Sequence, residues 1–232
     1  MFDRWLPVAA SSYAQELDGL MVFISVVVGV WFIAAEALLI YSVLRFRRKP
    51  GVPAAYLPGR SLRAMMIVLI PCSIVFCLDI VIDLVAAPIW HDIKEELPPQ
   101  GDRVRITGEQ WAWRFTYPGA DGEFDTPDDF FTVNELRVVV DRNILFELRA
   151  KDVVHSLWIP ELRLKQDAVP GRVGRGWFRA TREGRYEIPC AEICGFGHTI
   201  MKGHLTVESQ EAHRAWRAPQ LAALNESPVS WR

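Results

Sequence analysis

The sequence has no excess of positive charge, because 28 Asp and Glu residues slightly outnumber 26 Lys and Arg residues. Proteins that bind nucleic acid through its phosphates present a basic surface, so no general attraction to nucleic acid is predicted. Cysteine is also scarce, and the four cysteines include no Cys-x-x-Cys-His pattern. That pattern attaches c-type haem, and its absence excludes a covalently bound haem of that type.

Two stretches that look like ligand-binding loops lack the necessary spacing. Residues 121–129 are acidic but do not have the EF-hand spacing of Ca²⁺ ligands, which favours a solvated loop. Residues 170–176 are rich in glycine but do not open a helix. A phosphate-binding loop needs its glycines to lead into a helix N-terminus, so none is predicted here.

Two long apolar runs are present, at residues 20–44 and 64–90. Each exceeds the roughly 20 residues that a bilayer-spanning helix needs, so a transmembrane helical hairpin is predicted for residues 20–90. The connection between the runs carries basic residues and no acid, and the positive-inside rule places it in the cytoplasm. Residues 1–19, an outer lead-in, and the polar chain after residue 90 then lie outside. In a bacterial cytoplasmic (inner) membrane this side is the periplasm.

Several residues in or near the hairpin need separate explanations. Trp5 and Tyr13 are expected at the level of the lipid headgroups, where aromatic side chains concentrate. Glu36, Asp79 and Asp83 lie within the apolar runs, where acids are energetically costly and usually have a partner or a function. Asp79 and Asp83 are four residues apart and share one helix face. We expect that face to pack on a neighbouring subunit.

Short strands are predicted after a linker at residues 91–101, where consecutive prolines break the helix. From Trp111 to Tyr117 apolar and polar residues alternate with a period of two, which is the strand pattern. Turn residues separate similar segments at sandwich-like spacing. An all-β sandwich or barrel is therefore predicted for residues 102–208, followed by a C-terminal helix and tail at residues 209–232. The other expected strands are 104–107, 136–140, 144–148, 177–180, 185–188 and 203–207.

One short segment concentrates side chains that bind metals. It contains Cys190, Cys194, His198 and Met201. Thiolate and imidazole donors favour copper, and a methionine is a common weak ligand of electron-transfer copper sites. Such a site needs a second histidine, for which His155 is the candidate.

The spacing alone leaves two alternatives open. Cys190 and Cys194 could form a disulfide, because the domain is predicted to be extracytoplasmic. They could also bind structural Zn²⁺ together with His155 and His198, since zinc accepts two cysteines and two histidines. Neither alternative uses Met201, and copper is the interpretation that uses all five side chains.

The segment Cys190–Met201 closely resembles the dinuclear copper A motif of the cytochrome c oxidase subunit II family. Asp152–Ser156 is similar to the family's upstream histidine motif, Leu164–Arg172 to the stretch that follows it, and Glu109–Trp113 to its aromatic segment. The resemblance extends over nearly the whole chain and is strongest in residues 109–207. It implies a two-helix transmembrane hairpin followed by an all-β cupredoxin-like sandwich.

The resemblance also implies how the metal is held. Cys190 and Cys194 would bridge two copper ions, and His155 and His198 would be the terminal ligands. Met201 would be a weak ligand to one of the two ions.

Other residues acquire roles from the same resemblance. Glu192 would bind the second copper through its backbone carbonyl and would hold Mg²⁺ or Mn²⁺ at the subunit I interface through its carboxylate, since hard oxygen donors suit these ions. Trp111 matches the surface tryptophan through which cytochrome c delivers its electron. Asp152 and Asp167 match acids of the family motifs. Each would either contribute to a negative docking patch for a basic cytochrome c or make a structural hydrogen bond.

The activity that the resemblance implies is that of a respiratory cytochrome c oxidase, an oxidoreductase and translocase. This subunit would assemble with subunit I and other oxidase subunits in membrane lipid. Its copper A centre would accept electrons from cytochrome c and pass them to haem in subunit I, where oxygen is reduced to water and protons are pumped. The alternatives are the copper A subunit of a haem-copper nitric oxide reductase and a non-redox, zinc-binding membrane-anchored domain.

One departure from the family pattern limits what can be transferred. Ala64 stands where many relatives have a glutamate at the mouth of a proton channel. No role in proton entry is therefore predicted for this chain.

Overall fold

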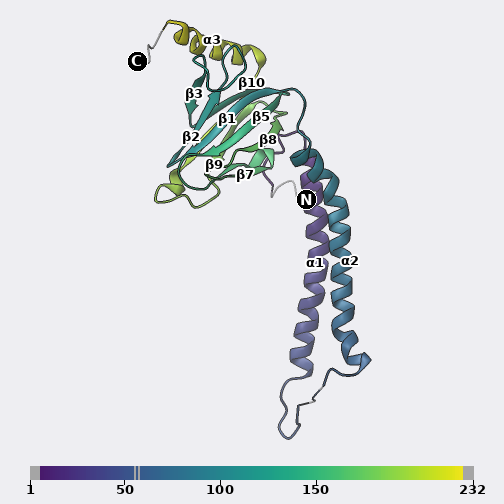
Figure 1. The fold of residues 1–232 in the computed structure, drawn as a ribbon. Helices are drawn as coiled ribbons and strands as arrows, with labels where there is room; N and C mark the ends of the chain where they lie inside the picture. The colour runs from purple at the N-terminus through teal and green to yellow at the C-terminus, as the bar shows by residue number, and fades with distance from the viewer. Residues whose placement is uncertain (1–5, 55, 57, 227–232) are drawn as a thin grey trace. The chain divides into compact units, whose positions relative to one another are not determined.

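The computed structural model describes residues 6–54, 56 and 58–226. The chain divides into two compact units, of which one comprises Glu16–Trp90 and the other combines Met1–Gln15 with His91–Arg232. The first unit is helical, and the second holds all the strands of the described chain (Figure 1). The predicted fold class, an apolar helical pair followed by a β-sandwich, is confirmed.

The helical unit is a pair of long apolar helices, α1 (Ala14–Arg45) and α2 (Leu62–Trp90). Both are long and apolar enough to span a membrane, with mean hydropathies of 2.4 and 2.7 over an 18-residue window. Apolar side chains lie on all faces of each helix, which is the pattern of helices surrounded by an apolar medium. The three acids within the predicted apolar runs, Glu36, Asp79 and Asp83, are exposed.

Both helices extend beyond their predicted limits. Helix α1 begins at Ala14 instead of residue 20, and Glu16 lies in its first turn, where a negative charge is favourable. After α2, a π-helical turn at His91–Glu95 continues the helix into the expected linker. The first residue of the linker that cannot continue a helix is Pro98, which explains why the helix extends past residue 90.

The β unit contains three sheets. A five-stranded sheet has the order β3-β2-β1-β5-β8, a three-stranded sheet the order β4-β10-β9, and a third sheet pairs β6 with β7. Most neighbours are antiparallel, but β1 with β5 and β10 with β4 are parallel. The strands are β1 (Asp102–Glu109), β2 (Ala112–Tyr117), β3 (Phe130–Val133), β4 (Glu135–Val139), β5 (Asn143–Ala150), β6 (His155–Ile159), β7 (Leu164–Ala168), β8 (Gly174–Arg179), β9 (Gly184–Pro189) and β10 (Lys202–Glu208).

Each predicted strand is present, but β3, β6 and β7 lie outside the predicted set. These three are short, and apolar and polar residues do not alternate regularly in their sequences. Strand β6 buries His155, Ser156 and Leu157 in succession, because both of its faces are covered. A period-two pattern cannot reveal a strand of this kind.

The sandwich core is formed by side chains that point inward from the two larger sheets. Burial alternates along the strands, as in β1 and β2. Burying one large apolar side chain stabilises the fold by about 1.5–3 kcal/mol, so this core is the main source of stability. Its fully buried members include Ile106, Phe115, Leu148 and Phe178 from the larger sheet, and Leu136, Ile188 and Leu205 from the smaller one.

The strand directions place different loops at the two ends of the sandwich. One end carries the β1–β2 turn, the start of β6 and the loop between β9 and β10. The other end carries the β4–β5 turn and the start of helix α3 (Gln210–Glu226), which follows β10 (Figure 1). Trp216 fixes α3 to the sheet, since its ring centroid lies 5.3 Å from that of Tyr117 and 5.8 Å from that of Phe130.

The acidic loop at residues 121–129 is tied to strand β1 by arginines. Arg105 Nη1 lies 2.6 Å from Asp125 Oδ1, and Arg103 Nη1 lies 3.6 Å from Glu123 Oε2. These carboxylates therefore have cationic partners within the chain.

The segment before α1 belongs to the β unit and corrects the expectation for Tyr13. Ala10 N donates to Glu161 O at 2.9 Å and Ser11 Oγ donates to Leu162 O at 2.8 Å. Tyr13 is 4% exposed, and its ring lies edge-on to Trp177 with centroids 5.6 Å apart. Tyr13 is thus a core residue of the β unit and not a headgroup anchor, whereas Trp5 lies outside the described residues.

Replacing Tyr13 with Ala is expected to destabilise the β unit by about 3–5 kcal/mol, the usual cost of removing a buried aromatic ring. Chemical denaturation of the full-length protein in detergent, followed by tryptophan fluorescence, measures this change. Tyr41→Ala is the matched control, because Tyr41 is 57% exposed on α1. A small and equal effect of both substitutions would contradict the core assignment.

Candidate metal centre

All candidate ligands except His155 lie on the loop that joins β9 to β10, residues 190–201, which we name the metal loop. The loop is closed at its base, where Cys190 N donates to Met201 O at 3.1 Å. Gly195 has φ +117°, a conformation that residues with a Cβ rarely adopt, and it reverses the chain after Cys194. A short 3₁₀ turn at His198–Ile200 then returns the chain to β10. Donors at both ends of the loop thereby come together.

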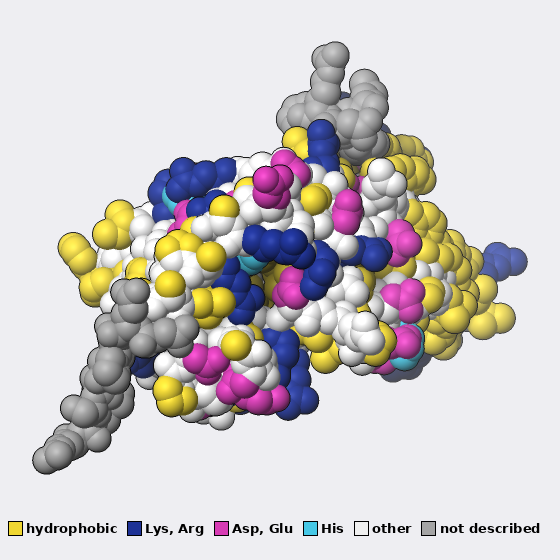
Figure 2. Space-filling model, turned by 90° about the horizontal axis from the view of Figure 1, so that it is seen from above, with side chains coloured by type: hydrophobic (Ala, Val, Ile, Leu, Met, Phe, Trp, Pro, Cys, Tyr) yellow, Lys and Arg dark blue, Asp and Glu magenta, His cyan; other side chains and the backbone are white. Residues whose placement is uncertain are grey.

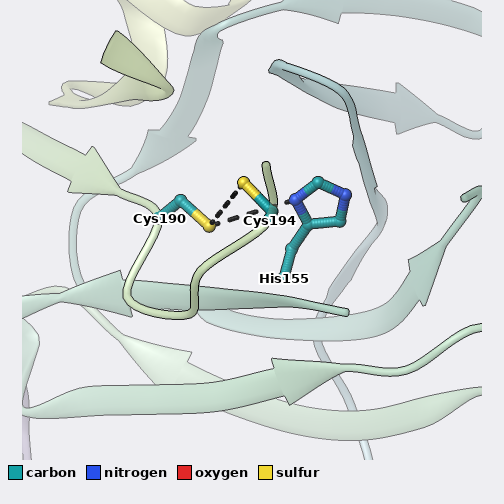
Figure 3. Close-up of side chains that lie close together, drawn as sticks. All are labelled: His155, Cys190 and Cys194. Carbon is teal, nitrogen blue, oxygen red and sulfur yellow. Dashed lines mark hydrogen bonds between the residues drawn. The ribbon is translucent and has the colours of Figure 1, made fainter. Parts of the chain in front are cut away.

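Cys190 and Cys194 form the middle of the site. Their Sγ atoms are 3.8 Å apart (Figure 3), well beyond the bond length of about 2.05 Å in a disulfide, and both are free thiols. Both cysteines are buried. Two adjacent soft donors inside the protein are thus available to a metal ion.

His155 reaches the cysteines from another sheet. It begins β6, which meets the loop through a bridge between Leu157 and Cys190 and a 2.9 Å hydrogen bond from Ala191 N to Ser156 O. The side chain of His155 is fully buried, and its Nδ1 lies 3.9 Å from Cys190 Sγ (Figure 3).

The remaining donors surround the two thiols. His198 Nδ1 and Met201 Sδ each lie 3.7 Å from Cys194 Sγ, and Glu192 O lies 3.3 Å from Cys190 Sγ. Donors that share an ion at about 2.0–2.3 Å are separated by distances of this size. The set of two thiols, two imidazoles and a thioether therefore fits soft, copper-type coordination.

Asp152 fixes the orientation of His155. Its Oδ1 lies 2.8 Å from His155 Nε2, so the other ring nitrogen faces Cys190. Gln110 N donates to the second carboxylate oxygen at 2.7 Å. Partial burial of Asp152 opposes ionisation, but the hydrogen bonds from His155, Gln110 and Val153 hold the pKa of its carboxyl below the ordinary value. A carboxylate behind a metal-binding histidine is a common arrangement that sets the ring orientation.

Asp167, the other candidate docking acid, accepts a hydrogen bond from Ser156 Oγ at 2.7 Å. It is exposed at the same time. The structure thus gives both acids a hydrogen-bonding role and leaves part of each accessible to solvent.

Trp111 covers the loop from the β1–β2 turn. Its Nε1 donates to Cys194 O at 3.3 Å, and Gln110 Nε2 donates to the same carbonyl at 2.8 Å. Gly197 permits this contact, because a Cβ there would lie 2.4 Å from the indole Cδ2 of Trp111. Trp111 remains 39% exposed, so one side chain contacts both the metal loop and solvent.

An apolar rim, defined by Ile193, Phe196 and Ile200, surrounds the tip of the loop. These side chains are 81%, 99% and 75% exposed, respectively. Surface apolar residues that cluster together commonly mark an interaction site. Glu192 is exposed beside this rim, with only its backbone carbonyl directed to the thiols.

The thiol of Cys194 holds its proton firmly. Burial, followed by the hydrogen bond to Cys190, raises the pKa of the Cys194 thiol to about 11. At neutral pH a metal ion must therefore displace this proton to bind.

Sequence reasoning did not identify two residues that shape the site. Gly108 makes room for the His155 ring, and Gln110 links Asp152 to the Cys194 carbonyl. Gly108 and Gln110 are the neighbours of Glu109, with which the aromatic motif begins. Their position beside this motif is the only feature of the sequence that points to them.

The chain is similar in sequence and in structure to known oxidase subunits. A family model described as the periplasmic domain of cytochrome c oxidase subunit II matches residues 103–209. The chain is 30% identical over 243 residues to the alternative cytochrome c oxidase subunit 2 of Bradyrhizobium diazoefficiens, covering 93% of this chain and 83% of the relative. It is 29% identical over 239 residues to cytochrome c oxidase subunit 2 of Cereibacter sphaeroides, covering 90% and 77%. The crystal structure of the periplasmic domain of subunit II of cytochrome oxidase from Bradyrhizobium japonicum matches with a TM-score of 0.47 and 27% identity, over 56% of this chain and 98% of that one.

Gly108→Ala is expected to weaken copper binding about 10- to 100-fold, the range for changes behind a metal ligand. The new Cβ would lie 2.9 Å from Cγ and Cδ2 of His155, which is fully buried and has no space to retreat. Titration of the purified protein against a copper chelator measures the affinity.

Gly174→Ala is the matched control for this prediction. Its nearest contact, also at 2.9 Å, is the flexible end of the Gln166 side chain, which can move aside. Equal copper affinities in the two variants would contradict the role given to Gly108.

Proposed function

The chain belongs to the cytochrome c oxidase subunit 2 family, and we propose that it is the electron-entry subunit of a respiratory oxidase. In this proposal a dinuclear copper centre accepts electrons from cytochrome c and passes them to haem in subunit I. Reduction of oxygen to water and proton pumping belong to subunit I. The observation that supports the proposal most strongly is the pair of buried thiols 3.8 Å apart, each with its own histidine within 4 Å.

The number of donors favours copper over structural zinc. A structural zinc site is closed by four ligands, which Cys190, Cys194, His155 and His198 would supply. Met201 Sδ and Glu192 O would then be left against the thiols without a role. Two ions use all six donors, and a thioether is a ligand that copper accepts.

The protein's part in electron transfer is to hold the donors still. When bound, a pair of copper ions would supply a one-electron redox centre. The hydrogen bond from His155 to Asp152 restrains the ligand on strand β6, and those from Gln110 and Trp111 to the Cys194 carbonyl restrain the metal loop. Ligand atoms that are held rigidly and shielded from water move little when electron transfer changes the charge of the metal site.

We propose Trp111 as the point of electron entry. It is the aromatic side chain that joins the solvent surface to the metal loop, through its hydrogen bond to Cys194 O. The apolar rim and the two exposed residues Asp152 and Asp167 lie at the same end of the sandwich. They would provide the contact and the negative charge for a basic cytochrome c, where charge complementarity mainly raises the association rate.

The carboxylate of Glu192 is proposed to bind Mg²⁺ or Mn²⁺ at the interface with subunit I. Its side chain is exposed while its carbonyl faces the thiols. Hard oxygen ligands suit these ions, and the remaining ligands would have to come from the partner subunit.

The helical pair is proposed to anchor this subunit in the bacterial cytoplasmic membrane, in contact with lipid, subunit I and other oxidase subunits. The basic connection between the helices favours a cytoplasmic position for the hairpin turn. The β unit would then lie in the periplasm, where cytochrome c is available.

Metal content tests the proposed centre directly. The full-length protein should contain two copper ions and give a mixed-valence EPR signal, whereas one zinc ion and no signal would exclude the electron relay. Cys190→Ser and Cys194→Ser should abolish the dinuclear site, because each removes a central thiolate. Met201→Leu should retain copper and change only its potential, since a thioether is a weak ligand.

Glu192→Gln serves as the control in the same loop. It preserves the backbone carbonyl and should keep both copper ions, while the assembled oxidase should lose bound Mg²⁺ or Mn²⁺. Complete copper loss in Met201→Leu and Glu192→Gln alike would contradict the ligand roles proposed here.

Trp111→Phe is expected to slow electron transfer from reduced cytochrome c about tenfold, equivalent to about 1.4 kcal/mol in the barrier. Stopped-flow oxidation of cytochrome c by the assembled oxidase measures the rate, and copper content should be unchanged. Trp158→Phe is the matched control, because Trp158 on β6 is 40% exposed and Trp111 is 39% exposed. Equal slowing by both substitutions would contradict entry through Trp111.

A further inference from the structure

A second concave site lies at the end of the sandwich opposite the metal loop. We name it the arginine pocket. It has a volume of about 500 Å³ and is bounded by the start of β1, the end of β2, the end of β4 and the first turns of α3. Figure 2 shows Lys and Arg side chains gathered around a hollow on this face of the β unit. Its arginines are Arg103, Arg137, Arg142, Arg214 and Arg217.

The pocket carries more positive charge than its acids neutralise. Three of the arginines are paired: Arg137 with Glu208, Arg142 with Asp102 and Arg103 with Glu123. The other two have no carboxylate partner within the described part of the chain.

The two unneutralised arginines lie one helical turn apart on α3. Arg217 Nη2 donates to the carbonyls of Pro118 and Gly119, at 2.6 and 3.4 Å, which orients its guanidinium at the pocket wall. Arg214 is exposed. Two positive charges are thus concentrated at one concave surface without a paired carboxylate among the described residues.

The shape of the arginine pocket is fixed by side chains that pack against one another. Trp216 packs edge-on against the stacked rings of Tyr117 and Phe130, and Arg137 Cζ lies 5.2 Å from the centroid of the Trp216 ring. His213 is 9% exposed beneath the arginines and contacts Glu208 at 3.1 Å. Because these groups are fixed before any ligand arrives, binding would require little ordering of the protein.

The chemistry of the lining identifies the kind of ligand. Guanidinium groups match the paired oxygens of phosphate and carboxylate groups. Gln210, the first residue of α3, also lines the pocket, and the start of a long helix favours negative charge. A volume near 500 Å³ falls in the range of pockets that bind small organic ligands.

We propose that the arginine pocket binds a small multivalent oxyanion, with two or more phosphate or carboxylate groups. The site is separate from the metal centre. Strand β1 enters the pocket at Asp102 and ends at Glu109 beside the metal loop, and eight residues of strand span roughly 25 Å. The proposal therefore does not depend on the metal that the loop holds.

Isothermal titration calorimetry of the full-length protein in detergent tests the proposal, in low-salt buffer without phosphate because salt screens exposed charges. Pyrophosphate and citrate are the probes, and acetate is the monovalent control. Saturable binding of pyrophosphate or citrate with one site per chain, much tighter than that of acetate, is expected. Stronger binding of one probe would tell whether the natural ligand carries phosphate or carboxylate groups.

Arg214→Gln and, as a second variant, Arg142→Gln should each weaken binding about tenfold, since each removes a charge-assisted contact. Arg182→Gln is the matched control, because Arg182 is exposed and does not line the pocket. Three results would overturn the proposal: no saturable binding, equal effects of all three substitutions, or binding of polyglutamate without binding of either small anion. The last result would identify an acidic protein surface as the partner.

Discussion

The short bridge between strand β6 and the metal loop is the contact on which the site depends. Leu157 pairs with Cys190, and Ala191 N donates to Ser156 O. Four of the side-chain donors are local to the loop, but His155 comes from a different sheet and reaches Cys190 only because this bridge aligns the two segments. Register in a sheet is set by the surrounding strands, so the position of one imidazole rests on the packing of the whole sandwich.

Burying polar groups costs folding free energy unless each group has a hydrogen-bond partner. In this structure the residues around the ligands supply such partners, and those residues are themselves hydrogen-bonded. Asp152 restrains His155, and Gln110 restrains both Asp152 and the Cys194 carbonyl. Gly108 and Gly197 leave space where a Cβ would collide with His155 and Trp111. The ligands are therefore held in place before metal binds, and the high pKa of the Cys194 thiol means that binding also releases a proton.

The two ends of the sandwich are chemically opposite. One end has an exposed apolar rim around soft sulfur and imidazole donors, and the other has a pocket lined by arginines. Strands β1 and β2 run between them and contribute to both. A rigid sheet can carry two such sites because its loops at either end vary without disturbing the core.

Patterns that are local in the chain could be recognised from the sequence alone. The apolar runs, the alternating strands and the cluster from Cys190 to Met201 each depend on residues near one another, so composition and spacing reveal them. Tertiary structure decided the rest: that Tyr13 is a core residue of the β unit, that β6 exists although its burial does not alternate, and that Gly108 makes room for His155. These features are contacts between distant segments, and their geometry is determined only when the sheets pack, because burial and register are properties of the folded chain and not of its order of residues.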